Sequence, residues 1–287
     1  MIKRLISLQA AMLLTACSSA PLPTTKVDAT RPANVSFSSL AQQAAPDISI
    51  SLAYGTAPLQ FGRLYLPASI AANTTVPLLV FVHGGCWLNA YDLNHAAAFS
   101  QAMAAEGIAV WSVEYRRVGD EGGGWPGSLQ DVQQALTFAF DELNSYPLDK
   151  HRVAIAGHSA GGQLALLAGA NAQAHKLQAV IGLAAITDLS AYAAGNNSCQ
   201  QATTGFMGGS AAQLPAQYKL ASPQSQLLPD NALLLHGSSD TIVPVNQATT
   251  SGIRYQIIEN AGHFDWLHPK TQAFSSLLKQ LQEQFAK

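Results

Sequence analysis

The chain shows two kinds of hydrophobic pattern, which differ in length and period. Segments rich in apolar residues and of strand length recur at 78–82, 108–115, 153–156, 179–186, 232–237 and 253–258, and the continuous run 78–82 is typical of a strand buried on both faces. Segments compatible with helices follow most of these runs, at 94–106, 128–143, from 160 and from about 271. Strands that alternate with helices predict a mostly parallel sheet with right-handed crossovers.

Two further segments complete the predicted domain. Residues 47–54 alternate polar and apolar, and 60–66 follow after a turn with Gly and Pro, which predicts an antiparallel hairpin. Residues 190–225 are rich in Ala, Gly, Asn and Gln with little periodicity, and we expect them to form a cap above the strand ends. The 287 residues, 48% of them hydrophobic, can bury one large core. We therefore predict an α/β fold with a mostly parallel central sheet, helices on both faces and a short cap.

The composition argues against several classes of protein. The formal net charge is −2, and no basic cluster follows the first few residues, so nothing indicates a nucleic-acid partner. The three cysteines lack C-x-x-C spacing and no H-E-x-x-H motif occurs, so the sequence carries no metal signature. The oligomeric state is left open.

The first residues have the pattern of a secretory signal. Lys3 and Arg4 precede an apolar run, Leu5–Leu14, which is too short for a usual membrane span. The following Leu14-Thr15-Ala16-Cys17 resembles the lipobox of bacterial lipoproteins. This resemblance implies a signal peptide at 1–16, a membrane anchor at a lipidated Cys17 and a place in the bacterial cell envelope. An ordinary cleaved signal with a chance cysteine is the alternative.

The residue after the cysteine and the segment that follows refine this picture. The residue after Cys17 is Ser18 and not Asp, which resembles the sequence of lipoproteins sent to the outer membrane. We therefore expect the anchor to lie in the outer membrane and the protein to face the periplasm. Residues 17–46 are rich in Ser, Thr, Pro, Ala and Gln, which predicts a flexible tether. The folded domain is expected at 47–287.

The segment 153–165 predicts a strand, a sharp turn and a helix. Its turn reads Gly157-His158-Ser159-Ala160-Gly161, which is a G-x-S-x-G nucleophile elbow. A serine at the tip of such a turn projects its hydroxyl out of the sheet. The free N–H groups and the dipole of the following helix favour an oxyanion there. We therefore predict that Ser159 is a nucleophile.

A second glycine-containing turn supplies candidate oxyanion donors. His83-Gly84-Gly85-Cys86-Trp87 directly follows the buried run 78–82. Adjacent glycines after a strand allow backbone N–H groups to converge on one point. We predict an oxyanion hole made by the N–H groups of Gly84, Gly85 and Ala160.

An acid and a base follow Ser159 in the order that a Ser-Asp-His triad requires. Asp240 follows the apolar run 232–237, and His263 follows the last run, 253–258. Both positions lie at carboxyl ends of predicted parallel strands, where ligands bind in open α/β sheets. Asp188 and Asp230 are alternative acids, and Asp265 is assigned to the surface or a helix start.

The other histidines are given structural or ordinary roles. Three of them lie at predicted strand ends, where they are expected to bond loop backbone: His83, His158 and His236. The rest are interpreted as surface or satisfied histidines: His95, His151, His175 and His268. In the predicted mechanism His263 takes the proton of Ser159, Asp240 orients the imidazole, and no cofactor is needed.

Together these motifs resemble the α/β-hydrolase superfamily. The H-G-G-x-W loop, the elbow, Glu114-Tyr115-Arg116 and Gly262-His263 resemble the esterase branch that includes hormone-sensitive-lipase-like, feruloyl or acetyl esterase-like and arylformamidase-like enzymes. The resemblance covers residue 47 to the end and implies a serine hydrolase acting on small-molecule acyl or aryl esters. Cleavage of a formyl amide, or a binding lipoprotein without catalysis, are the alternatives. Cys86 departs from the glycine or aromatic residue common in this loop.

The sequence also suggests a residue that binds substrate and a disulfide near the site. Of the aromatic residues near the motifs, only Trp87 is selected as a residue that binds substrate. Cys86 and Cys199 would be the only thiols left after lipidation of Cys17, and the compartment is oxidising. A disulfide between them would fix the cap to the oxyanion loop, and two separate thiols are the alternative.

Overall fold

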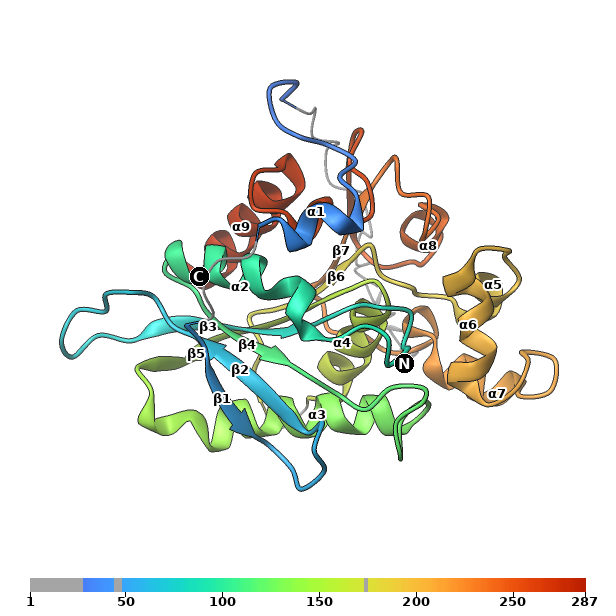
Figure 1. The fold of residues 1–287 in the computed structure, drawn as a ribbon, viewed down its shortest axis with the longest axis horizontal. Coiled ribbons are helices and arrows are strands. Elements are labelled where there is room, and N and C mark those ends of the chain that lie inside the picture. The colour runs from blue at the N-terminus through green and yellow to red at the C-terminus, as the bar shows by residue number, and fades with distance from the viewer. Residues whose placement is uncertain (1–27, 44–47, 173–174) are drawn as a thin grey trace, which may run out of the picture.

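The computed structural model describes residues 28–43, 48–172 and 175–287, which form one eight-stranded sheet with the order β1-β2-β4-β3-β5-β6-β7-β8 (Figure 1). The strands are β1 (Ile50–Ala53), β2 (Phe61–Tyr65), β3 (Val76–Val82), β4 (Ala109–Val113), β5 (Leu148–His158), β6 (Ala179–Leu183), β7 (Ala232–Gly237) and β8 (Tyr255–Ile258). β1 and β2 pair antiparallel, and β3 to β8 run parallel to one another. The predicted hairpin and parallel sheet are therefore confirmed. β6 ends at Leu183, earlier than its apolar run, because Ala184 takes a left-handed φ of 46°.

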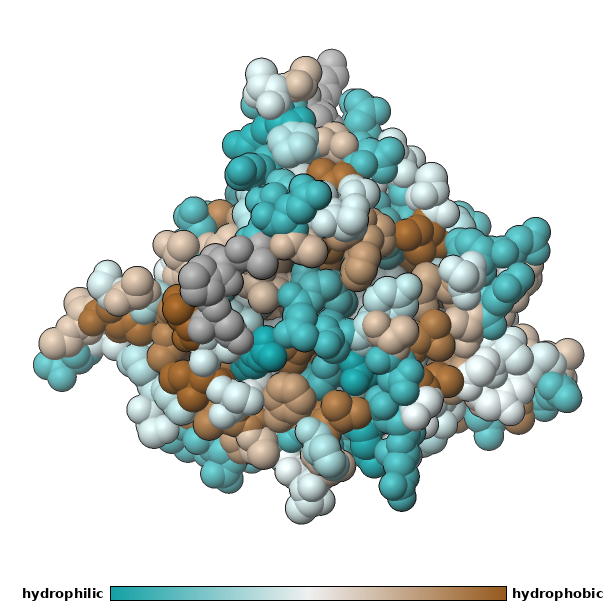
Figure 2. Space-filling model, viewed as in Figure 1, coloured by the Kyte–Doolittle hydropathy of each residue, from teal (hydrophilic) through white to brown (hydrophobic). Residues whose placement is uncertain are grey.

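Helices cover both faces of the sheet, as predicted. α3 (Gly127–Asp141) and α4 (Ala160–Asn171) lie on one face, and α2 (Ala97–Ala105) and α9 (Gln272–Phe285) on the other (Figure 1). Each face has its own buried apolar cluster between sheet and helices. Polar residues are interspersed with apolar ones over the outer surface shown in Figure 2. This is the α/β-hydrolase fold that the motifs imply.

Three helices form the cap at the predicted place: α5 (Leu189–Ala193), α6 (Ser198–Met207) and α7 (Pro215–Ala221). α6 begins with a capping box between Asn197 and Gln200 and is followed by its C-cap residue Gly208, whose φ of 74° is a left-handed conformation that favours glycine. The remaining short helices are α1 (Phe37–Ala41), α8 (Asn246–Thr249), η1 (Leu93–Ala96), η2 (Leu143–Ser145), η3 (Pro223–Ser225) and η4 (Asp265–Leu267).

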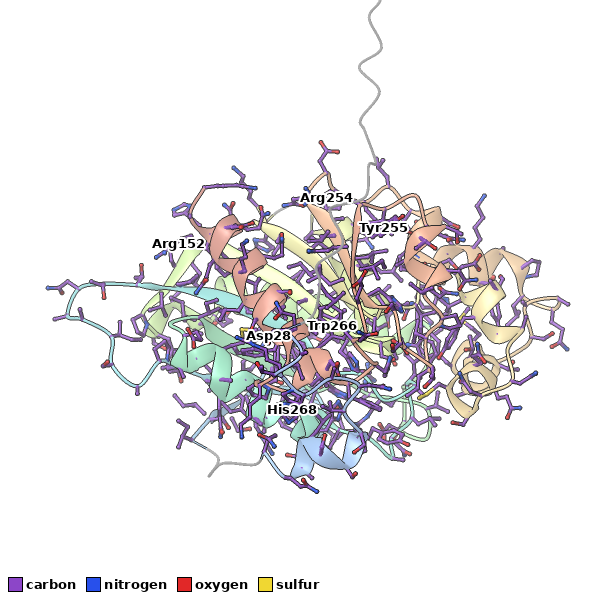
Figure 3. All side chains as sticks on the ribbon, turned by 90° about the horizontal axis from the view of Figure 1, so that it is seen from above. Asp28, Arg152, Arg254, Tyr255, Trp266 and His268 are labelled. Atoms are coloured by element: carbon purple, nitrogen blue, oxygen red, sulfur yellow. A yellow bond between two sulfur atoms is a disulfide. The ribbon has the colours of Figure 1, made fainter. Side chains whose placement is uncertain are left out.

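Residues 28–43, which we call the N-terminal strap, differ from the expected flexible tether because they pack on the domain. The backbone N–H groups of Asn34 and Val35 donate to the two carboxylate oxygens of Asp265, at 2.8 and 2.7 Å. Arg31 bonds Ser275 in α9, and Figure 3 shows the strap passing this helix with Asp28 near its start. Besides the buried Leu40, polar contacts of the strap backbone hold it, and such contacts leave no hydrophobic period in its sequence. Cys17 and the expected signal peptide lie outside the described residues.

Within the described ranges, every helix is too short or too polar to cross a lipid bilayer.

Candidate active site

The turn between β5 and α4 places Ser159 at the tip of a strained elbow. Ser159 has φ 56° and ψ −120°, a region that residues other than glycine rarely adopt. A Cβ atom on Gly157 would lie 2.1 Å from the carbonyl oxygen of Gly161, and one on Gly161 would lie 2.2 Å from that of His83. The glycines that flank the serine are therefore required by the close crossing of strand, helix and oxyanion loop.

His263 and Asp240 meet beyond the carboxyl ends of β8 and β7. His263 Nδ1 lies 2.7 Å from Asp240 Oδ2, and Asp240 also accepts hydrogen bonds from the N–H groups of Ile242 and Val243. Burial alone would raise the pKa of Asp240, but the neighbouring His263 and His236 and the hydrogen bonds from His263 and the N–H of Val243 together hold that pKa below its ordinary value. An ionised Asp240 keeps the proton of His263 on Nδ1, which leaves Nε2 free to act as a base.

Ser159 and His263 line one cavity of about 190 Å³. In the part of the chain that the structure describes, no hydrogen bond joins Ser159 Oγ to His263 Nε2. Such bonds are often long or poorly aligned without substrate and tighten in the reacting complex. The other lining residues are Phe37, Gly85, Cys86, Tyr91, His95, His158, Ser198, Cys199, Ile242 and Phe264.

The loop after β3 brings the predicted oxyanion donors to this cavity. A Cβ atom on Gly84 would lie 2.9 Å from the carbonyl oxygen of His158 and 3.1 Å from Cβ of Ser159, so any side chain here would force the backbone of the elbow to shift. Gly85 has φ 118° and lines the cavity, and Ala160 is the first residue of α4, next to Ser159. The structure therefore brings Gly84, Gly85 and Ala160 together around the serine.

A buried ionic network that the sequence analysis did not assign supports this loop. His83 Nε2 lies 2.9 Å from Glu114 Oε1, and His83 Nδ1 lies 2.7 Å from the carbonyl oxygen of Gly84. Burial would raise the pKa of Glu114, but His83, Arg117 and the hydrogen bond from the N–H of Tyr115 together outweigh burial and hold that pKa below its ordinary value, so the carboxylate stays ionised. A glutamate at the end of a strand buried on both faces was the sequence signal for this role.

The remaining histidines of the site divide into two groups. His158 Nε2 bonds the carbonyl oxygen of His263 at 2.9 Å, and His236 Nε2 bonds that of Val243 at 2.9 Å, so their predicted backbone-bonding roles are confirmed. Burial lowers the pKa of both imidazoles. His95 was assigned an ordinary role, but it lines the cavity, where burial lowers its pKa to about 3 and keeps it neutral.

The expectation that Trp87 binds substrate does not hold. Trp87 has no exposed surface, stacks on Phe206 with ring centroids 4.5 Å apart, and donates from Nε1 to Gln163 Oε1 at 3.0 Å. The left-handed φ values of Cys86 and Trp87, 55° and 58°, turn the chain within the loop, where the tryptophan packs under the cap. The aromatic residues that line the cavity are instead Phe37, Tyr91 and Phe264, none of which the sequence analysis selected as a binding residue.

The alternative acids lie away from His263 or bind other groups. Asp188 caps α5 by accepting from the N–H of Ala191 at 2.9 Å. Asp230 precedes β7 and so lies at the opposite end of that strand from Asp240. Asp265 is buried, so its expected surface position is wrong, but it does lie at a helix start, because it is the first residue of η4. Its carboxylate binds the strap.

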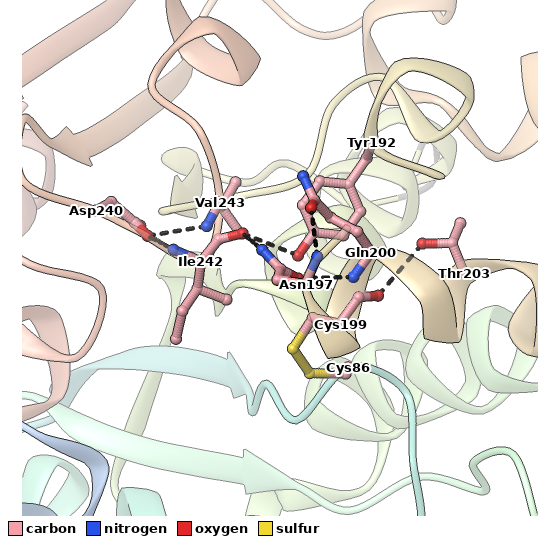
Figure 4. Close-up of a disulfide and its surroundings, with 9 residues drawn as sticks. All are labelled: Cys86, Tyr192, Asn197, Cys199, Gln200, Thr203, Asp240, Ile242 and Val243. Atoms are coloured by element: carbon pink, nitrogen blue, oxygen red, sulfur yellow. Dashed lines mark hydrogen bonds between the residues drawn. A yellow bond between two sulfur atoms is a disulfide. The ribbon is translucent and has the colours of Figure 1, made fainter. Parts of the chain in front are cut away.

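A disulfide joins Cys86 of the oxyanion loop to Cys199 of α6, with Cα atoms 5.0 Å apart (Figure 4). The hypothesis that these cysteines pair is therefore confirmed by the structure. The same region of the cap contacts the Asp240 loop, because Asn197 Nδ2 and Tyr192 Oη both donate to the carbonyl oxygen of Ile242, at 2.9 and 3.2 Å. The cap thus contacts both loops that build the site.

Comparison with known proteins places this arrangement in a family. The BD-FAE family model matches residues 63–251, which include the oxyanion loop, Ser159 and Asp240. The chain belongs to the BD-FAE family. Esterase LipC of Mycobacterium tuberculosis is 30% identical over 270 residues, which cover 82% of this chain and 66% of LipC. Carboxylesterase NlhH of the same organism is 33% identical over 103 residues, 36% of this chain and 31% of NlhH. The chain thus spans about two thirds or less of these relatives.

Solved structures show that this BD-FAE chain shares its fold with esterases. A truncated carbohydrate esterase from gut microbiota aligns with a TM-score of 0.69 and 20% identity, over 84% of this chain and 97% of that one. Esterase B from Lactobacillus rhamnosis aligns with a TM-score of 0.72 and 18% identity, over 87% of this chain and 90% of that one. At these identities the likeness shows the fold alone.

Proposed function

We propose that this protein is a serine hydrolase that cleaves carboxylic esters of small acyl or aryl groups. The observation that carries the proposal is that Ser159, on a strained elbow, and His263, bonded to Asp240 at 2.7 Å, line one cavity. The esterase names of the relatives support the same reaction class.

In the proposed mechanism His263 Nε2 takes the hydroxyl proton as Ser159 Oγ attacks the ester carbonyl carbon. The carbonyl π electrons move to its oxygen, and the N–H groups of Gly84, Gly85 and Ala160 stabilise this oxyanion, each contributing about 3 kcal/mol. When the carbonyl re-forms, the ester C–O bond breaks and the leaving alkoxide takes the proton from His263. Water then gives a proton to His263, attacks the acyl-enzyme and releases the acid, and Ser159 regains its proton.

The size and lining of the cavity favour small groups. A volume of about 190 Å³ is below the usual range for pockets that hold drug-sized ligands, and the rings of Phe37, Tyr91 and Phe264 make much of its wall apolar. The triad would also cleave a formyl amide, so the test must separate the two reactions.

The test measures hydrolysis of p-nitrophenyl acetate, butyrate and octanoate and of N-formylkynurenine. We expect ester hydrolysis that Ser159→Ala lowers by at least about 10⁴-fold, while the exposed control Ser190→Ala retains it. Equal activity of the protein and Ser159→Ala would overturn the proposed nucleophile. Turnover of the formamide alone would make the protein an amide hydrolase. A folded protein inactive on every substrate would favour a binding module.

We further propose that Cys17 is acylated and anchors the protein to the bacterial cell envelope, in the outer membrane facing the periplasm. The lipobox-like Leu14-Thr15-Ala16-Cys17 and the following Ser18 support this proposal. Labelled palmitate should enter the protein in cells and should not enter Cys17→Ser. Labelling of both forms, or of neither, would overturn it.

A further inference from the structure

The N-terminal strap reaches into the cavity that holds Ser159. Phe37, the first residue of α1, lines the cavity, although every other lining residue belongs to the part of the chain from Gly85 onward. The ring centroid of Phe37 lies 5.6 Å from that of Tyr91, 5.6 Å from His95 and 5.4 Å from Phe264. These rings are in contact, so together they form a continuous aromatic wall.

The strap is fixed to the segment that carries the catalytic base. The Asp265 carboxylate accepts from the N–H groups of Asn34, Val35 and Gly262, and Gly262 precedes His263 directly. A Cβ atom on Gly262 would lie 2.9 Å from the backbone Cα of Asn34, so a side chain here would force the strap to shift. The position of Phe37 is thereby set relative to His263.

Two apolar residues of the strap, Leu40 and Phe37, differ in exposure, and this difference indicates different roles. Leu40 is 4% exposed and packs in the core, as expected of a residue that holds α1 on the domain. Phe37 is 39% exposed, although its ring packs on three others and lines the cavity. A large aromatic side chain left partly open beside a nucleophile is suited to contact an apolar ligand group.

We propose that Phe37 determines substrate specificity by forming the wall that limits the length of the acyl group. This inference rests on the proposed ester hydrolysis. The wall closes one side of a small cavity, so an acetyl or butyryl chain fits within it, whereas a longer chain must displace the phenyl ring. Replacing that ring by a methyl group opens this side and gives the longer chain apolar surface to occupy.

The test compares kcat/KM for p-nitrophenyl acetate, butyrate and octanoate. We expect Phe37→Ala to raise the octanoate-to-acetate ratio of kcat/KM by at least about tenfold, and Phe37→Trp to lower the butyrate-to-acetate ratio. Phe140→Ala is the matched control, because Phe140 stacks on His175 away from the cavity, and it should keep the ratios of the unchanged protein. Asp265→Ala releases the strap and should shift the octanoate-to-acetate ratio in the direction of Phe37→Ala.

The outcomes distinguish this inference from the function on which it rests. If the protein hydrolyses esters and Phe37→Ala and Phe37→Trp both keep its ratios, the role of Phe37 is wrong and the esterase proposal stands. A shift of the same size in Phe140→Ala would also overturn the inference, because the effect would not belong to the cavity wall. If the unchanged protein hydrolyses no ester, both proposals fail.

Discussion

Glu114 Oε1 lies 2.9 Å from His83 Nε2, and both side chains are buried beneath the oxyanion loop. The other ring nitrogen of His83 is 2.7 Å from the carbonyl oxygen of Gly84, so the imidazole bridges the Glu114 carboxylate and the backbone of the loop. The trans peptide that links Gly84 to Gly85 is planar, so a carbonyl directed at His83 directs the N–H of Gly85 the opposite way. The pair therefore orients one of the proposed oxyanion donors.

Glu114→Gln tests this positioning role. The neutral amide cannot balance the charge of Arg117 and is a weaker acceptor for His83, so we expect the loop to lose its fixed orientation and kcat to fall at least about tenfold, with less change in KM. Glu106→Gln is the control, because Glu106 is exposed at the end of α2. Steady-state kinetics on a short ester provides the readout, and an unchanged kcat in Glu114→Gln would show that the network does not orient the donor.

The same carboxylate makes stability depend on pH. The pKa of Glu114 is held below its ordinary value of 4.5 in the folded protein. Its contribution to the free energy of unfolding is therefore complete above that value and is lost as the pH falls through the lower, folded-state pKa. Urea unfolding between about pH 6 and pH 3 should show a shallower loss of stability in Glu114→Gln than in the unchanged protein. Parallel pH profiles would contradict the lowered pKa.

Asp240→Asn separates the proposed acid from its alternatives. An asparagine can donate to Nδ1 and so favour the wrong tautomer of His263, which predicts a loss of about 10⁴-fold in kcat with the fold intact. Asp188→Asn is a matched control, because asparagine also caps helices and Asp188 caps α5. If Asp188→Asn lost activity and Asp240→Asn retained it, the assignment of the acid would be wrong.

The sequence analysis predicted the triad positions but not the direction of Trp87 or the packing of the strap, and the reason is physical. The predicted positions of Ser159, Asp240 and His263 follow from apolar runs and strand ends, which are local in the chain. The side-chain direction of Trp87 depends on two successive left-handed residues, and no hydrophobic period reports these. The strap is held by backbone N–H groups on the buried Asp265, a contact between distant segments that leaves no pattern in either. Phe37 and His95 reach the cavity only through such tertiary contacts.

Trp87→Phe tests the corrected role of Trp87. Phenylalanine keeps a ring against Phe206 but leaves the buried Gln163 Oε1 without its donor, so we expect the free energy of unfolding to fall by about 1–3 kcal/mol. The ratio of kcat/KM between long and short esters should stay unchanged, because Trp87 does not line the cavity. A changed ratio with unchanged stability would restore the substrate-binding role.

Reduction of the Cys86–Cys199 disulfide tests how strongly the cap is tied to the oxyanion loop. The two cysteines are separated by 113 residues, so the bond removes about 4–5 kcal/mol of chain entropy from the unfolded state in the simplest treatment. For a domain of this size that corresponds to a fall in Tm of roughly 10 °C on reduction. The variant with Cys86→Ala and Cys199→Ala should melt near the reduced protein and should not respond to reductant, which separates the disulfide from other effects of the reagent.

Reduction of the disulfide should also lower kcat, because Cys86 lies in the loop that carries Gly84 and Gly85 and lines the cavity with Cys199. If reductant changes neither Tm nor kcat, while thiol titration shows that both cysteines have been released, the cap does not depend on this bond for its position.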